Sequence, residues 1–183
     1  MNRAGARVLD VIHGDIWVEY TRRSDARLVI PTNGIVNRSG DAVMGRGLAL
    51  QVARRFPDVP AALGRALREQ TARTPTSTYW SASPSNPPPY LVTALPHRLI
   101  SFPVKKHWKD SADLSLIERS AWELAAWLRQ PDVSGYGLSI ILPCVGCGNG
   151  RLAWAQVRLR LEALDAYDIA GRVRVIDVAG IRR

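Results

Sequence analysis

Two adjacent lysines, Lys105 and Lys106, are the side chains whose surroundings best suit chemistry. They follow a largely apolar segment, Leu99–Val104, which predicts a buried strand, and Trp108 comes soon after them. A lysine amine is a nucleophile only when unprotonated, and burial or a neighbouring positive charge such as Lys106 lowers the pKa of an ammonium group. The competing interpretation is a solvated basic strand end, which residue type alone favours.

Two glycine-rich loops indicate where such a lysine would meet a ligand. One follows the apolar segment Leu28–Ile30 and leads through Gly47 into a helix-period segment. The other follows the apolar segment Leu138–Leu142 and spans Gly146–Gly150 before another helix. Loops after buried parallel strands open at the same edge of a sheet, where the N–H groups at helix starts bind anions. The pattern therefore favours a phosphate-containing ligand over two ordinary connections.

Four segments then resemble the macrodomain family, in the family's order along nearly the whole chain. They are Gly14–Ile16, Thr32-Asn33 with Met44–Gly47, Phe102–Trp108 (FPVKKHW) and Gly146–Trp154 (GCGNGRLAW). The resemblance implies a three-layer α/β/α fold with a mixed central sheet and an ADP-ribose pocket. It is nearest in look to the branch that contains terminal ADP-ribose glycohydrolase and the antitoxin macrodomains that reverse DNA ADP-ribosylation.

In that branch a lysine attacks the distal ribose and displaces the modified group, which by resemblance makes Lys105 the catalytic residue. The expected activity is removal of ADP-ribose from a nucleic-acid base or an acidic protein side chain, with no metal and no cofactor. The resemblance also implies that Asp15 accepts from adenine and that Asn33 faces the distal ribose. The other expected ligand-binding residues are Ile16, Met44, Gly45, Gly47, Gly146, Cys147, Gly148, Asn149 and Gly150.

One departure leaves an alternative open. Terminal ADP-ribose glycohydrolase carries an aspartate near the end of the second loop, where this chain has Gly150, as antitoxin-like macrodomains also can. The proton-transfer partner of Lys105 is therefore not identified. A module that binds ADP-ribose or a related metabolite without turnover would use the same pocket, with Lys105 and Lys106 only offsetting phosphate charge.

Composition bounds the remaining expectations. At 183 residues, 46% of them hydrophobic, the chain can bury one core, so residues 1–183 are expected to form a single domain. A monomer is a separate expectation. Cys144 and Cys147 have CxxC spacing but no second pair, which argues against zinc. No signal peptide or membrane span is recognisable, so a cytoplasmic location is expected. A net charge of +9 fits either a solvated surface or a substrate attached to nucleic acid.

Further elements are expected from periodicity. Predicted strands are Val8–Ile12, Thr76–Trp80, Tyr90–Thr93 and Val173–Val178. Ile16–Tyr20 either extends the first strand or turns back, and Ser83–Pro89 is expected to form a stiff surface turn. Predicted helices are Ala61–Arg73, Asp113–Leu128, with Asp113 as N-cap, and Ala153–Leu164. Asn37 and Asp41 lie in the first loop without an assigned role.

Overall fold

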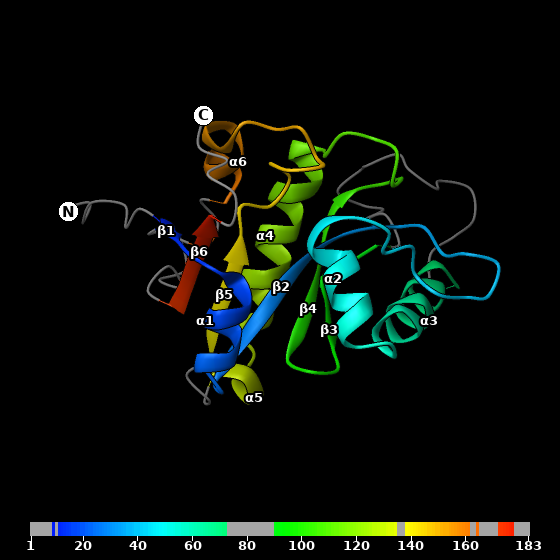
Figure 1. Cartoon of the computed structure of the whole chain (residues 1–183), viewed down its shortest axis with the longest axis horizontal. Helices are drawn as coiled ribbons and strands as arrows, with labels where there is room; N and C mark the ends of the chain where they lie inside the picture. Colours follow the sequence, from blue (N-terminus) through cyan, green and yellow to red (C-terminus); the bar gives the residue numbers. More distant parts are fainter. Residues whose placement is uncertain are drawn as a thin grey trace.

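The computed structural model describes residues 9, 11–72, 90–134, 138–161, 164 and 172–177. Within them, one six-stranded sheet has the order β1-β6-β5-β2-β4-β3 (Figure 1). All neighbouring strands are parallel except β3, which runs antiparallel to β4. The strands are β1 (Val11–His13), β2 (Ala26–Asn33), β3 (Thr93–Leu95), β4 (Leu99–Lys105), β5 (Ser139–Pro143) and β6 (Val173–Asp177). The predicted mixed sheet is confirmed, and the apolar segment Leu28–Ile30 lies in β2, between β5 and β4.

Helices cover both faces of this sheet, which completes the predicted three layers (Figure 1). One face packs against α1 (Ile16–Arg22), α2 (Gly47–Arg55) and α3 (Val59–Ala72). The other packs against α4 (Leu114–Leu128) and α6 (Trp154–Arg160), while the short α5 (Pro131–Ser134) follows α4. Along β2, Leu28 and Ile30 pack on the face covered by α1, α2 and α3, whereas Val29 packs on the face covered by α4 and α6. Successive residues of a strand point to opposite faces of the sheet. No helix in these residues is both long and apolar enough to span a bilayer.

Prolines mark the ends of the strands that carry the loops. Pro31, Pro103 and Pro143 lie in the last residues of β2, β4 and β5, respectively. Proline has no N–H for the strand ladder, so it is tolerated where pairing ends. The register between β2 and β4 shifts between Thr32 and Asn33, at the point where these two strands diverge. The loops of the site therefore open from the carboxyl ends of adjacent parallel strands, as expected.

The start of α4 is attached directly to the end of β4. The Asp113 carboxylate accepts from the N–H groups of Ser115 and Leu116 at 2.9 and 3.3 Å, which confirms the predicted N-cap. The Asp113 N–H donates to the carbonyl of Val104 at 2.8 Å. These bonds fix the path of the chain on both sides of Lys105.

Several boundaries differ from the sequence expectations. Residues 16–22 form helix α1, because Asp15 caps it and the Ile16 and Tyr20 side chains are buried on one face. The strand expected over Tyr90–Thr93 is instead β3, Thr93–Leu95. Helix α3 starts before Pro60, since a first-turn proline lacks only an N–H that would find no helical partner.

The last elements are also shorter or lie partly outside the described residues. Helix α6 ends at Arg160, with Leu161 as its C-cap, before the predicted end at Leu164. The expected strand Thr76–Trp80 and the proline turn Ser83–Pro89 fall outside the described residues, as do Val8 and Asp10 of the first strand.

Candidate active site

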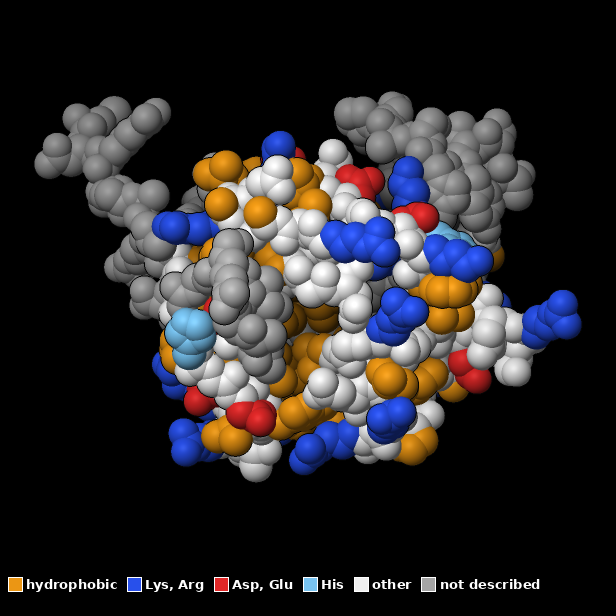
Figure 2. Space-filling view, turned by 45° about the horizontal axis from the view of Figure 1, so that its top comes forward, with side chains coloured by type: hydrophobic (Ala, Val, Ile, Leu, Met, Phe, Trp, Pro, Cys, Tyr) orange, Lys and Arg blue, Asp and Glu red, His pale blue; other side chains and the backbone are white. Residues whose placement is uncertain are grey.

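A cavity of about 680 Å³ opens at the carboxyl ends of β2, β4 and β5. It brings together most of the residues that the sequence indicated, from four separate segments: Ile16, Asn33, Met44, Gly45, Gly47, Lys105, Gly146, Gly148, Asn149 and Gly150. Asp15, Cys147 and Lys106 do not line it. Figure 2 shows a hollowed face with Lys and Arg side chains scattered around it.

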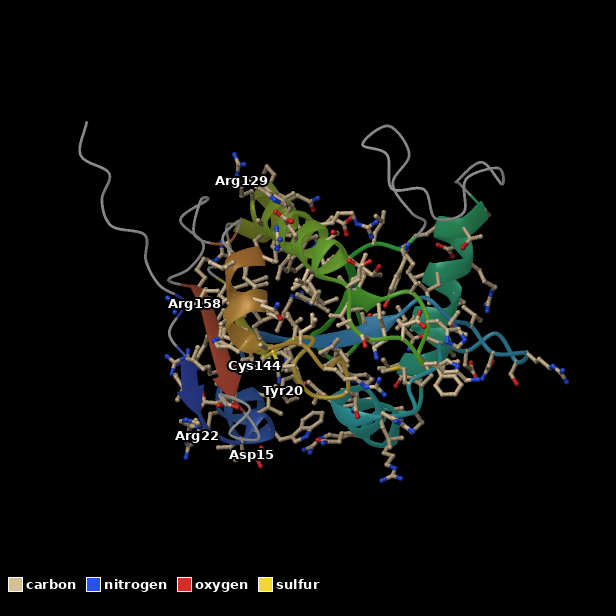
Figure 3. The ribbon with its side chains drawn as sticks, turned by 90° about the horizontal axis from the view of Figure 1, so that it is seen from above. Asp15, Tyr20, Arg22, Arg129, Cys144 and Arg158 are labelled. Carbon is tan, nitrogen blue, oxygen red and sulfur yellow. The ribbon has the colours of Figure 1, made fainter. Side chains whose placement is uncertain are left out.

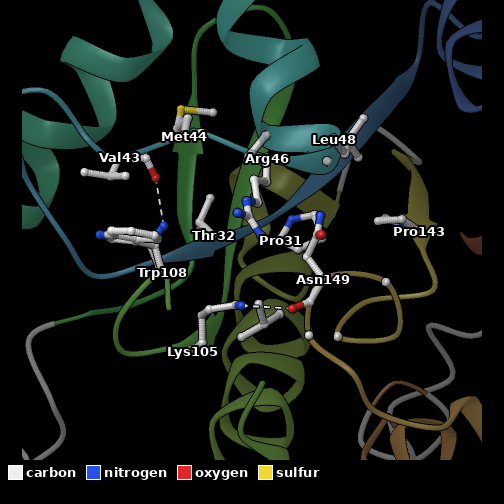
Figure 4. Close-up of a pocket in the computed structure, with 18 of the residues that line it drawn as sticks. Pro31, Thr32, Val43, Met44, Arg46, Leu48, Lys105, Trp108, Pro143 and Asn149 are labelled. Carbon is white, nitrogen blue, oxygen red and sulfur yellow. Dashed lines mark hydrogen bonds between the residues drawn. The ribbon is translucent and has the colours of Figure 1, made fainter. Parts of the chain in front are cut away.

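Lys105 is the last residue of β4, and its amine is held at the cavity by two backbone carbonyls. Its Nζ donates to the carbonyl of Asp110 at 2.7 Å. It also donates to the carbonyl of Asn149 at 3.3 Å (Figure 4). A neutral amine has two N–H donors and one lone pair. When the amine is unprotonated, both donors can be directed at these carbonyls, which leaves the lone pair for a ligand.

The surroundings of Lys105 make its ammonium group easier to deprotonate than that of an ordinary lysine. Partial burial lowers the pKa of the Lys105 ammonium below its usual value, and the guanidinium groups of Arg151 and Arg46 lower it further, against the opposing effect of the Asp110 carboxylate. The effect of Lys106 on this pKa stays a prediction. Lys106 lies beyond the strand end, where its carbonyl accepts from Gly34 N–H at 3.0 Å.

Asn33 holds the first glycine loop in place. Its Nδ2 donates to the carbonyl of Val43 at 2.7 Å, and its Oδ1 accepts from the N–H of Ile35 at 3.0 Å. The amide thus crosses the loop from one side to the other while still lining the cavity. Asn37 and Asp41 form a turn further out, through the Asp41 N–H to the Asn37 carboxamide at 2.9 Å, and neither lines the cavity.

The start of α2 supplies backbone donors to the cavity. Arg46 is the N-cap of this helix, and its side chain makes no hydrogen bond to the N–H groups of the first turn. Those N–H groups have no hydrogen-bond partner within the helix itself. Gly47 has φ +59°, and a Cβ there would lie 3.0 Å from Asn149 Nδ2. The two glycine loops therefore approach each other across the cavity, and Arg46 reaches toward the space between them (Figure 4).

The glycines of the second loop serve different purposes. Gly146 has φ +76° and faces the Ile117 side chain, and a Cβ on Gly150 would lie 2.3 Å from the Gly146 carbonyl oxygen, so both are needed for the loop's own packing. Gly148 would place its Cβ in open space. It also lines the cavity, so Gly148 is where a side chain would meet a ligand rather than the protein.

Asp15 caps helix α1 instead of facing the cavity. Its carboxylate accepts from the N–H groups of Trp17 at 2.7 Å and Val18 at 3.2 Å. Figure 3 shows it near the edge of the molecule, at the start of α1. The next residue, Ile16, is buried and does line the cavity. A role for Asp15 toward adenine stays a prediction.

Cys147 points into the core. Its thiol lies 3.5 Å from the carbonyl of Val145, and burial, with the charge of Asp177, raises its pKa to about 11. Cys144, also a free thiol, takes part in lining the cavity. Among the described residues, no group of three or more His, Cys, Asp or Glu side chains could hold a metal ion.

Sequence reasoning missed several lining residues. Arg46 and Trp108 lay inside the recognised segments, yet only the folded arrangement shows that they face the cavity. Arg151 has φ +63° directly after the second loop, and Gln51 accepts from Trp17 Nε1 at 2.6 Å. The available signals were an arginine at a helix start and an arginine ending a glycine loop.

The sheet order, the helices on both faces and the cavity between two glycine loops define a macrodomain. The solved macrodomain of Mycobacterium tuberculosis DarG superposes with a TM-score of 0.60 at 26% identity, over 93% of this chain and 99% of that one. The macrodomain of Thermus aquaticus DarG gives a TM-score of 0.54, also at 26% identity, over 92% of this chain and 96% of that one. The chain thus has the macrodomain fold.

Sequence comparison points to one branch of these proteins, although no protein-family profile matches the chain. A DNA ADP-ribosyl glycohydrolase of Thermus aquaticus is 32% identical over 143 residues, which are 77% of this chain and 36% of the relative. One of Mycobacterium tuberculosis is 30% identical over 170 residues, 87% of this chain and 44% of the relative. The chain therefore resembles this branch but spans less than half the length of either relative.

Proposed function

We propose that this macrodomain is a hydrolase that removes ADP-ribose from a modified DNA base, with Lys105 as the nucleophile. The observation that carries the proposal is the Lys105 amine. It lies at the cavity, donates to two carbonyls, and has a pKa held below the usual value by partial burial and two nearby guanidinium groups. A lysine that only offset phosphate charge would gain nothing from a lowered pKa.

Substrate binding follows from the two loops. The diphosphate of ADP-ribose would lie between the first turn of α2 and Gly148, where backbone N–H groups and the positive end of a helix suit an anion. Arg46 and Arg151 would offset its charge. The adenosine would then extend toward Ile16, which leaves the distal ribose at Lys105.

The chemistry is a double displacement at the anomeric carbon of the distal ribose. The Lys105 lone pair forms a bond to this carbon while the bond to the DNA base breaks, and the electron pair leaves with the base, which takes up a proton. The lysine nitrogen loses a proton to solvent. Water then adds to the same carbon and breaks the lysine–carbon bond, releasing ADP-ribose and the free amine.

DNA is the favoured substrate for two reasons. The relatives that are 30% and 32% identical are named DNA ADP-ribosyl glycohydrolases. The chain also carries a net charge of +9, which attracts a polyanion.

The test is release of free ADP-ribose from three substrates: ADP-ribosylated single-stranded DNA, a protein ADP-ribosylated on acidic side chains, and ADP-ribose phosphate. We expect release from the DNA. Release from the protein alone would contradict the DNA assignment, and tight ADP-ribose binding with release from none would identify a binding module.

A further inference from the structure

Trp108 occupies a position that the proposed function leaves without a role. It lines the cavity, and 43% of its surface is exposed. An exposed indole that lines a cavity offers a flat aromatic face to a ligand. Trp108 also follows Lys105 by only three residues.

The sheet order places Trp108, which follows β4, at the end of the cavity away from the proposed adenosine position. From β4 the order runs through β2 and β5 to β6 and β1. Gly47 follows β2, Gly148 follows β5, and Ile16 follows β1, so a bound ADP-ribose would extend from Lys105 toward β1. Trp108 and Pro143 accordingly lie on opposite sides of the cavity in Figure 4. The leaving base departs from the face of the anomeric carbon opposite the Lys105 amine, outside the space that the adenosine and diphosphate would fill, and Trp108 lines this remaining part of the cavity.

The turn that bears Trp108 is fixed to the amine of Lys105. The carbonyl of Asp110 accepts from Lys105 Nζ at 2.7 Å, and the Asp110 carboxylate accepts from His107 N–H at 3.2 Å. The Lys109 N–H donates to His107 Nδ1 at 3.2 Å, and this bond closes the turn. The turn that carries the indole is thus fixed relative to the Lys105 amine.

The ring also has supports that suit a nucleic acid. His107 stacks on it with ring centroids 5.4 Å apart and planes inclined by 28°. The Lys109 ammonium lies 5.1 Å from its centroid, on an exposed side chain that also lines the cavity. Aromatic rings with adjacent cations bind single strands by base stacking and phosphate pairing.

On the basis of the proposed function, we propose that Trp108 is the subsite for the leaving group: it stacks on the DNA base that carries ADP-ribose, while Lys109 pairs with an adjacent phosphate. Every base has a π face, whereas an aspartate or glutamate side chain has none. Trp108 therefore selects a nucleobase over an acidic protein side chain, and it contributes little to binding of free ADP-ribose.

The test measures affinity in a Lys105→Ala background, so that substrate is not consumed and the result does not depend on turnover. The ligands are an ADP-ribosylated single-stranded oligonucleotide, a peptide ADP-ribosylated on glutamate, and free ADP-ribose. Trp108→Ala should weaken the oligonucleotide about fivefold to 150-fold, the range for one stacked base. It should change the other two less than twofold, and Trp108→Phe should retain most of the oligonucleotide affinity.

Trp122 provides the matched control, because it is a tryptophan with 45% exposure on α4 that does not line the cavity. Trp122→Ala should leave all three affinities unchanged. Thermal unfolding checks each fold, and Trp108→Leu repeats the comparison with an apolar side chain that lacks a π face. The proposal is overturned if Trp108→Ala and Trp108→Leu bind the oligonucleotide normally, or if they weaken all three ligands equally. If the wild type did not release ADP-ribose from DNA, the proposed function would be refuted, whereas the binding comparison for Trp108 would be unaffected.

Discussion

Gly148 and Gly150 lie two residues apart in the same loop, yet substituting them should have opposite consequences. A Cβ on Gly150 would lie 2.3 Å from the Gly146 carbonyl oxygen and 2.8 Å from the Ala112 Cβ. Overpacking of this kind costs about 1–3 kcal/mol. In a chain of this size each kcal/mol lowers the melting temperature by about 2–4 °C, so Gly150→Ala should melt about 2–12 °C lower than the wild type.

Gly148→Val should leave stability within about 0.5 kcal/mol of the wild type, because no atom lies within 4 Å of the added Cβ. The new side chain would instead occupy the space assigned to the diphosphate. We expect calorimetry to show more than a tenfold loss of ADP-ribose affinity, a change of about 1.4 kcal/mol or more. Normal ADP-ribose binding by Gly148→Val would show that the anion does not contact this loop, and an unchanged melting temperature for Gly150→Ala would contradict the packing argument.

Two further predictions concern Asp15 and the pKa of Lys105. Asp15→Asn should keep the cap of α1 but weaken ADP-ribose binding by about 1–3 kcal/mol in calorimetry. Asp15→Ala should weaken binding in the same way and should also lose about 0.5–2 kcal/mol of folding stability. Normal ADP-ribose binding by Asp15→Asn would show that Asp15 is not part of the site. Turnover should rise with pH as Lys105 loses its proton and level off below the usual value of 10.5, because its pKa is lowered. Removing a positive charge with Arg151→Gln should shift that rise to higher pH, and removing a negative one with Asp110→Asn should shift it to lower pH. Unshifted profiles in both variants would mean that another group controls the rate.

The parts of the fold that could be predicted were those with local signals. The apolar segments of β2, β4 and β5 and the Asp113 cap are visible as periodicity and residue type. The parallel arrangement then placed both glycine loops at one edge. Helix α1 was missed because seven residues carry little periodic signal, although an aspartate before Ile16 is itself a capping signal.

The electrostatics of the site could not be predicted, because they depend on tertiary proximity. Arg46 and Arg151 are two of 25 Lys and Arg residues, and their places beside the glycine loops do not by themselves show that both approach Lys105. Only the approach of the two loops brings both near Lys105, whereas the adjacent Lys106 lies outside the cavity. In the same way, the motif that contains Asp15 indicates a ligand contact, while the folded chain uses its carboxylate to cap a helix.

The most direct test of Lys105 as nucleophile is borohydride reduction during turnover of ADP-ribosylated DNA, followed by peptide mapping. The ribosyl–lysine intermediate can open its ring to an imine, which borohydride would reduce to a stable adduct. We expect this adduct on Lys105 in the wild type and in the matched control Lys106→Ala. Lys105→Ala should give no adduct and almost no turnover, while holding ADP-ribose within about tenfold of the wild type, or about 1.4 kcal/mol. Full turnover by Lys105→Ala, or an adduct on Lys106 instead, would contradict this mechanism.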